Sequence, residues 1–159
     1  MIFKTLTIAA ALAFAGPAFA EEKPVDPYTQ SNANAGVAPF ADDRLLQAFH
    51  GPAGVGRVID EMLDGVVKDP RTAEIFKATD MERLRRTLKE QVIYILGGAS
   101  GYSGRDMKTA HKDQGVQQTD FNLLVEYLQV AMDHEKVPFR AQNQLLAKLA
   151  PMQRDVVER

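Results

Sequence analysis

The chain has 159 residues, with 19 lysines and arginines, 21 aspartates and glutamates, and no cysteine. The lack of cysteine excludes disulfide scaffolds, thiolate metal sites, cysteine nucleophiles and iron–sulfur ligation. The formal net charge of −2 argues against a nucleic-acid partner, because proteins that bind nucleic acids present basic surfaces. The length and the hydrophobic content of 45% are typical of one globular domain.

The first 20 residues have the pattern of a secretory signal peptide. Lys4 precedes an apolar run over residues 6–15, and residues 18–20 (Ala-Phe-Ala) have the small-x-small form that a signal peptidase cleaves. The apolar run is about ten residues long, which is too short for a membrane-spanning helix. We expect cleavage after residue 20 and a periplasmic or secreted protein with no membrane role beyond export; an uncleaved membrane anchor is the alternative.

Residues 21–41 are rich in proline, asparagine, serine and glycine and have no apolar periodicity. This composition predicts a flexible linker that acts as a tether or spacer. The working domain would then occupy residues 42–159.

Two long helices are expected in the first half of this domain. The first lies between Pro52 and Pro70, because proline is favoured in the first turn of a helix and often follows its end. The second begins after a cap at Thr79 or Asp80 and stops at the glycine pair 97–98. Their apolar side chains recur at helical spacing, with one face formed by Val55, Val58, Ile59, Met62, Leu63 and Val66 and the other by Met81, Leu84, Leu88, Val92 and Ile95.

A glycine-rich loop over residues 97–104 leads into a short helix over residues 105–112. Thr119 or Asp120 caps a third long helix, and a last helix runs from Pro138 to Pro151. The third helix has a buried face of Phe121, Leu124, Val125, Leu128 and Met132. No segment alternates like a strand, so the sequence predicts an all-α fold of two antiparallel helix pairs with short connectors.

Three histidines are candidate metal ligands. His50 precedes the first long helix and His134 ends the third, so we expect both at the surface. His111 lies on the short helix, with Met107 one turn earlier on the same face. No HExxH or paired-histidine spacing supports zinc. A structural role and a ligand role both stay open for His111, and a five-coordinate haem iron is the common metal group that takes a single histidine.

At this point a family resemblance becomes visible. The segments RVIDEML, DPRTAEIF, LGG-x-x-x-YSGRDM-x-x-AH and LAP occur in this order, and together they resemble the group I truncated haemoglobins. The similarity runs from about Leu45 to Val157. It implies a two-over-two helical sandwich around one haem b, diatomic gases as ligands, an electron donor of unknown identity and a monomeric state.

The resemblance also implies roles for single residues. His111 matches the histidine that ligates iron through Nε2, with its Nδ1–H bonded to a carbonyl near Met107. Phe76 matches a phenylalanine that packs on the haem face, and Tyr102 matches an aromatic residue of the loop before the short helix. Met107 and Phe121 match residues on the same side of the haem as the histidine.

The opposite, distal side departs from the family. Oxygen-binding relatives place a tyrosine on the first helix and often a glutamine on the second, where this sequence has Leu63 and Leu88. Leu84 is the third distal position. A leucine donates no hydrogen bond, and the loss of about 1.5–3 kcal/mol lowers O₂ affinity by roughly one to two decades. CO and NO depend less on that bond. Gln91 and Tyr94 are alternative donors, although the leucines fit the buried stripe better.

Arg85, Arg86, Lys108 and Lys112 are candidate partners for the haem propionates, without a fixed pairing. No histidine or lysine falls at the obvious sixth-ligand position, so we expect a five-coordinate ferrous iron or a water-bound ferric iron. The resemblance favours a protein that binds O₂, NO or CO for transport, storage or sensing. A haem-based redox enzyme, with nitric oxide dioxygenase or peroxidase-like activity, is one alternative. A haem-free helical interaction module is another.

Overall fold

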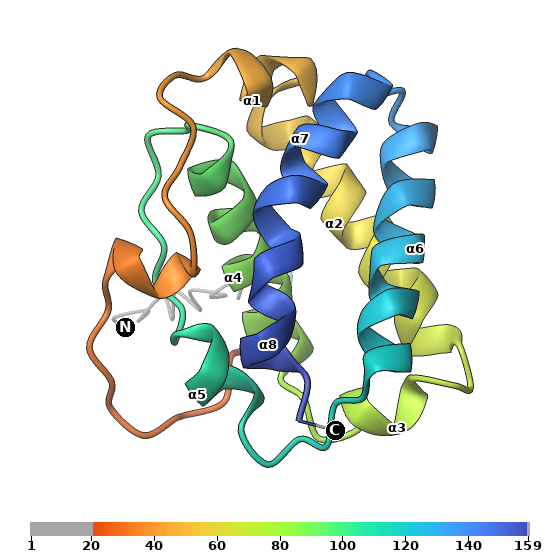
Figure 1. The fold of residues 1–159 in the computed structure, drawn as a ribbon. Coiled ribbons are helices and arrows are strands. Elements are labelled where there is room, and N and C mark those ends of the chain that lie inside the picture. Colours follow the sequence, from red (N-terminus) through yellow and green to blue (C-terminus); the bar gives the residue numbers. More distant parts are fainter. Residues whose placement is uncertain (1–20, 159) are drawn as a thin grey trace, which may run out of the picture.

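The computed structural model of the protein describes residues 21–158, and the predicted signal peptide lies outside them. The described part of the chain is helical and contains no strand, which confirms the predicted all-α class. Figure 1 shows the helices around a central α2. Their bounds are α1 (Arg44–Ala48), α2 (Gly51–Lys68), α3 (Ala73–Phe76), α4 (Met81–Ile95), α5 (Met107–His111), α6 (Gln118–His134), α7 (Phe139–Leu149) and α8 (Gln153–Val156), with 3-10 turns η1 (Asn32–Ala35) and η2 (Ala150–Met152).

The ends of the two helices in the first half follow local chemistry. Pro52 lies in the first turn of α2, where a missing N–H costs nothing. The Asp80 carboxylate accepts a hydrogen bond from the Arg83 N–H at 3.1 Å and so caps α4. Both boundaries agree with the prediction.

The start of α6 differs from the predicted cap at Thr119 or Asp120. Gln117 is the capping residue, and Asp120 lies three residues into the motif, where its carboxylate accepts from the Gln117 N–H at 2.8 Å. This reciprocal arrangement is a capping box, in which the acidic residue belongs to the first turn rather than before it. The short helix α5 is also shorter than the predicted residues 105–112, and Asp106 caps its start.

Helix α2 packs against both α4 and α6. Its approach to α6 is close at Gly65, where an added Cβ would lie 2.4 Å from the Tyr127 ring. The pairs α2–α4 and α6–α7 run antiparallel in Figure 1. The fully buried core includes Phe49, Ile59, Leu63, Ile95, Leu96, Met132 and Leu145.

None of the helices in the described residues combines the length and apolar character that a membrane crossing requires.

Residues 21–41 lie along the helices and differ in this from the predicted flexible linker. Ala35 of η1 is fully buried in the core, and the Phe40 N–H donates to the Ile95 carbonyl at 2.9 Å. The segment lacks apolar periodicity because most of its contacts are hydrogen bonds and ion pairs with distant residues. Composition alone does not reveal such contacts.

Candidate functional site

A cavity of about 180 Å³ lies between α2, α3, α4, α5 and α6 and is partly open to solvent. Most of its wall is hydrocarbon, contributed by Leu63, Val66, Ile75, Phe76, Leu84, Leu88, Met107, Ala110, Val116, Phe121, Leu124 and Val156. The arrangement suits an apolar ligand.

The structure places the predicted iron ligand, haem contacts and distal residues on the wall of this one cavity. They come from helices α2 to α6 and from the loop before α5, and they are Leu63, Phe76, Leu84, Leu88, Tyr102, Met107, His111 and Phe121. The fold therefore brings together residues that lie up to 58 positions apart. Their individual roles toward a cofactor stay predictions.

His111 is oriented by the main chain of its own helix. Its Nδ1 lies 2.7 Å from the Met107 carbonyl oxygen, four residues earlier. A carbonyl only accepts, so Nδ1 carries the hydrogen and Nε2 of the neutral ring keeps its lone pair. A histidine that ligates a metal is oriented by such a bond from its other ring nitrogen, and it is the bond that the family resemblance implies.

The hydrogen-bond donors on the cavity wall are largely engaged with the backbone. The Tyr102 hydroxyl donates to the Arg105 carbonyl at 3.0 Å, and burial raises the pKa of Tyr102 to about 12, so the phenol stays protonated at neutral pH. The other lining hydroxyl and amide donors make equivalent bonds to carbonyls in the same or a neighbouring turn, and they belong to Thr72, Thr79, Thr87 and Gln114. The leucines of the wall have no polar hydrogen at all.

Gln91 lies on the cavity wall, although the leucine stripe was the better sequence fit. Its side chain is buried, and its amide nitrogen lies 2.9 Å from the Ala35 carbonyl oxygen and 3.4 Å from the Met107 sulfur. The carbonyl partner requires an N–H, so at least one amide hydrogen is engaged with Ala35. Tyr94 is absent from the described lining residues. The contact with Ala35 is what shows the role of Gln91 in the structure. Apolar periodicity along the helix cannot predict a contact with a residue so distant in the sequence.

The four predicted propionate partners do not line the cavity. Arg85 pairs with Asp60 and Asp64, and Arg86 pairs with Glu22 and Glu90. Lys108 and Lys112 are also absent from the lining. The periodicity of α4 predicts on which side of the helix an arginine lies, but it does not predict which acidic residue pairs with that arginine.

Three other basic residues lie at the mouth. Lys23, Arg83 and Arg105 line a groove that shares several wall residues with the cavity, including Thr87 and Tyr102. The Arg83 Nε is buried without a hydrogen-bond partner in the described residues, with an Asp80 carboxylate oxygen 3.6 Å away. An anionic group at this mouth would meet cationic side chains, of which Arg83 already pairs with Glu22 and Asp80.

Comparisons with known proteins agree with this architecture. The pattern of a family described as bacterial-like globin matches residues 44–158. The chain is 32% identical over 115 residues to the Group 1 truncated hemoglobin LI410 of Chlamydomonas moewusii, covering 69% of this chain and 67% of that protein. It is 29% identical over 98 residues to the Group 1 truncated hemoglobin GlbN of a Synechocystis species, covering 59% and 79%.

Two solved structures have the same fold. The truncated hemoglobin from Tetrahymena pyriformis in its Fe(III) form superposes with a TM-score of 0.68 at 22% identity, covering 72% of this chain and 98% of that one. The 2/2 hemoglobin from a Synechococcus species, in the cyanomet state with covalently attached heme, gives 0.66 at 23% identity with the same coverage. These likenesses confirm the two-over-two helical sandwich.

Proposed function

The chain belongs to the bacterial-like globin family, and on that premise we propose that it binds O₂, NO or CO at a five-coordinate haem b iron held by His111. Its cofactor is haem, as in the truncated hemoglobins that it resembles. The observation that carries the proposal is the geometry of His111. The ring projects from the wall of an apolar cavity, with Nδ1 engaged and Nε2 free to ligate a metal.

The residues of the cavity fit a haem. An apolar macrocycle would contact the leucine and phenylalanine side chains, because burial of hydrocarbon against hydrocarbon is favourable. Its two carboxylates would face the mouth, where the side chains of Lys23, Arg83 and Arg105 lie. We therefore propose these three residues, in place of the four predicted from sequence, as the cationic partners of the propionates.

When bound, the haem iron supplies an open coordination position for a diatomic gas. Leu63, Leu84 and Leu88 would keep water from that position and donate no hydrogen bond to the ligand. A polar ligand such as O₂ would forgo about 1.5–3 kcal/mol, which is roughly one to two decades of affinity. We propose that the cavity shifts the preference from O₂ toward CO and NO.

A combined haem titration and resonance Raman measurement tests this function. The purified protein should bind one equivalent of haem with a Soret band, and the ferrous form should show an iron–histidine stretch that is absent in His111→Ala. Its CO complex should show the vibrational frequencies of an apolar pocket. A CO complex with a strong distal hydrogen bond would refute the leucine pocket, and a parent protein that takes up no haem would refute the function.

We also propose that the protein is exported, from the pattern in residues 1–20. Cell fractionation with N-terminal sequencing tests this step. A periplasmic or secreted form that begins at Glu21 would support export, whereas a cytoplasmic form with an intact N-terminus would refute it.

A further inference from the structure

We propose that residues 21–36, which we name the N-terminal brace, hold residues 102–111 against α4 and thereby position His111. The consequence for haem rests on the function proposed above, whereas the bracing itself does not. Such a role differs from that of a linker or tether, because it makes the segment part of the site.

The need for a brace follows from the local sequence around His111. Helix α5 has only five residues, and isolated helices of that length are not stable in water. The stretch that leads into it, residues 97–104, contains four glycines, which lose the most conformational freedom on folding. Local preferences therefore do not hold α5 in place. Its contact with α8 supports one side, and the other side needs a partner.

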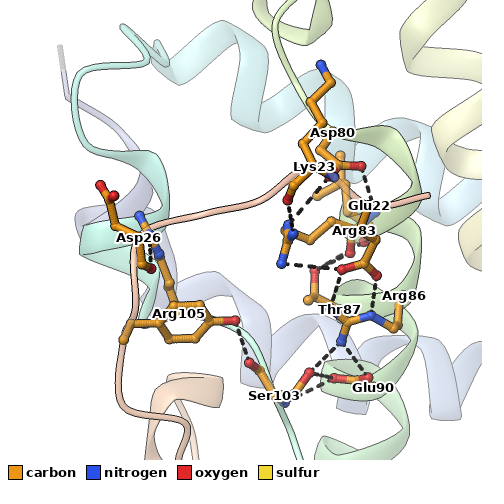
Figure 2. A network of polar contacts seen from close by, with 12 residues as sticks. Glu22, Lys23, Asp26, Asp80, Arg83, Arg86, Thr87, Glu90, Ser103 and Arg105 are labelled. Carbon is orange, nitrogen blue, oxygen red and sulfur yellow. Dashed lines mark hydrogen bonds and ion pairs between the residues drawn. The ribbon is translucent and has the colours of Figure 1, made fainter.

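The first end of the brace is attached to the start of α4. The Lys23 N–H donates to the Asp80 carboxylate at 2.7 Å, and the Arg83 guanidinium donates to the Lys23 carbonyl. The Glu22 carboxylate accepts two hydrogen bonds from Arg86, and Figure 2 shows it between Arg86 and Arg83. Residues 22 and 23 are therefore held by both main-chain and side-chain bonds.

The second part of the brace is attached to the residues that lead into α5. Its side chains and carbonyls pair with four consecutive residues, 102–105. The Asn32 carboxamide oxygen accepts from the Tyr102 N–H at 2.9 Å, and the Tyr28 hydroxyl donates to the Ser103 carbonyl at 2.8 Å. Further bonds run from Asn34 to the Gly104 carbonyl at 3.2 Å and from Arg105 to the Asp26 carbonyl at 3.0 Å, and the Arg105 guanidinium lies over the Tyr28 ring.

Helix α4 links these two attachments. Glu90 accepts hydrogen bonds from the Ser103 N–H at 3.0 Å and from Arg86 at 2.9 Å. Arg86, which binds Glu22, is therefore connected through Glu90 to the loop before α5. Figure 2 shows Glu22, Arg86, Glu90 and Ser103 as one chain of polar contacts. The brace, α4 and the loop thus form a three-part joint.

A second path leads from the brace to His111 through the cavity wall. The Ala35 carbonyl accepts from Gln91, the same amide nitrogen lies 3.4 Å from the Met107 sulfur, and the Met107 carbonyl orients His111. Ala35 is fully buried, so this carbonyl has no access to solvent as a substitute partner. Two residues therefore separate the brace from the ring.

Amide hydrogen exchange on the haem-free protein, with residues 21–41 present, tests the brace directly. The double variant Tyr28→Phe/Asn32→Ala removes two of its bonds to residues 102 and 103 without changing the cavity wall. Exchange over residues 102–111 should speed up by roughly fivefold for each bond lost, while α2 and α6 keep parental protection. Gln30→Ala is the matched control, because Gln30 is exposed and its side chain makes no hydrogen bond in the described residues. If the double variant does not fold, Tyr28→Phe alone serves.

The haem-loaded forms test the consequence. Haem transfer to an acceptor apoglobin should be several-fold faster from the double variant than from Gln30→Ala, and the iron–histidine stretch should broaden. Parental exchange over residues 102–111 in the variant would overturn the brace. Faster exchange in a protein that takes up no haem would support the brace and refute the proposed function, so the two failures are distinguishable.

Discussion

The two walls of the cavity are built by different means. The histidine wall, residues 102–111, is short and glycine-flanked and is held by hydrogen bonds to α4 and to residues 21–36. The leucine wall belongs to the long helices α2 and α4, where Leu63 is fully buried by packing. A metal ligand needs a defined ring orientation, which directional bonds supply. A wall that sets ligand preference by lacking donors needs only hydrocarbon of the right shape.

From this contrast we expect haem retention and gas-ligand preference to depend on different walls of the cavity. Changes on the histidine wall should alter haem retention and local stability. Changes on the leucine wall should alter ligand kinetics with little effect on haem.

The largest expected effect is the loss of the histidine itself. His111→Ala removes the iron ligand, and we expect haem affinity to fall by more than the roughly 10- to 100-fold that loss of a ligand's hydrogen-bond partner costs. Competition with an apoglobin measures the affinity, and added imidazole should restore the Soret spectrum. His134→Ala is the control, because His134 lies at the surface in contact with Glu61. If His111→Ala bound haem with the affinity of the parent, the histidine wall would not hold the cofactor and the contrast between the two walls would fail.

The leucine wall is tested by restoring a donor. Leu63→Tyr should slow O₂ dissociation by roughly 10- to 100-fold, because a hydroxyl can then stabilise the bound ligand. Leu63→Phe adds the same ring without the hydroxyl and should leave the rate within a few-fold of the parent. Flash photolysis and stopped-flow mixing measure both. Equal rates in the two variants would mean that Leu63 does not face the ligand.

Gln91 joins the two walls and should affect stability more than ligand choice. Gln91→Met keeps the volume but leaves the buried Ala35 carbonyl without its donor. The free energy of unfolding should fall by about 1–3 kcal/mol. Urea denaturation measures it, with Gln144→Met as the exposed control. A large change in O₂ dissociation without loss of stability would instead place Gln91 beside the ligand.

The smallest effect concerns acid. Hydrogen bonds and ion pairing with Arg86 lower the pKa of Glu22 below its ordinary 4.5. Burial raises the pKa of Glu90, but bonds from Ser103 and Arg86 outweigh it, so this pKa is also lowered. Groups with lowered pKa values stabilise the fold above their ordinary pKa and lose that contribution as pH falls through the lowered values. Protection of residues 102–104, corrected for intrinsic exchange, should therefore weaken below about pH 4.5.

Glu22→Gln checks the origin of this acid effect. The variant should have weaker protection at neutral pH and a smaller loss on acidification. An acid profile identical to that of the parent would show that Glu22 does not hold the brace.

Local patterns in the sequence were sufficient for the long helices. Pro52, Asp80 and the glycine at 97 mark the ends of α2 and α4 because capping and proline geometry depend on neighbours within a few residues. The same reasoning predicted the cap of α6 at Thr119 or Asp120, and this prediction was wrong. The acidic residue of a capping box lies inside the helix, three residues after the true cap. Apolar spacing also missed Leu123, which is buried on α6.

The candidate site followed from the order and spacing of short motifs. Through the family resemblance, they implied that His111 and the leucines share one site, and these residues line one cavity, whereas the four predicted propionate partners do not. Composition and periodicity missed Arg83 and the contacts of residues 21–36, and they ranked Gln91 below the leucines. The position of each is determined by a partner that is distant in the sequence, and no local pattern predicts that partner.

The sequence by itself determined the helices, because capping and periodicity are local properties, and its motifs carried the resemblance that pointed to His111 and the leucines. Only the tertiary structure decided which polar groups meet. The Gln91–Ala35 bond spans 56 residues and the Tyr28–Ser103 bond spans 75. A hydrogen bond forms only where folding brings donor and acceptor within about 3 Å, so bonds over such separations follow from the fold.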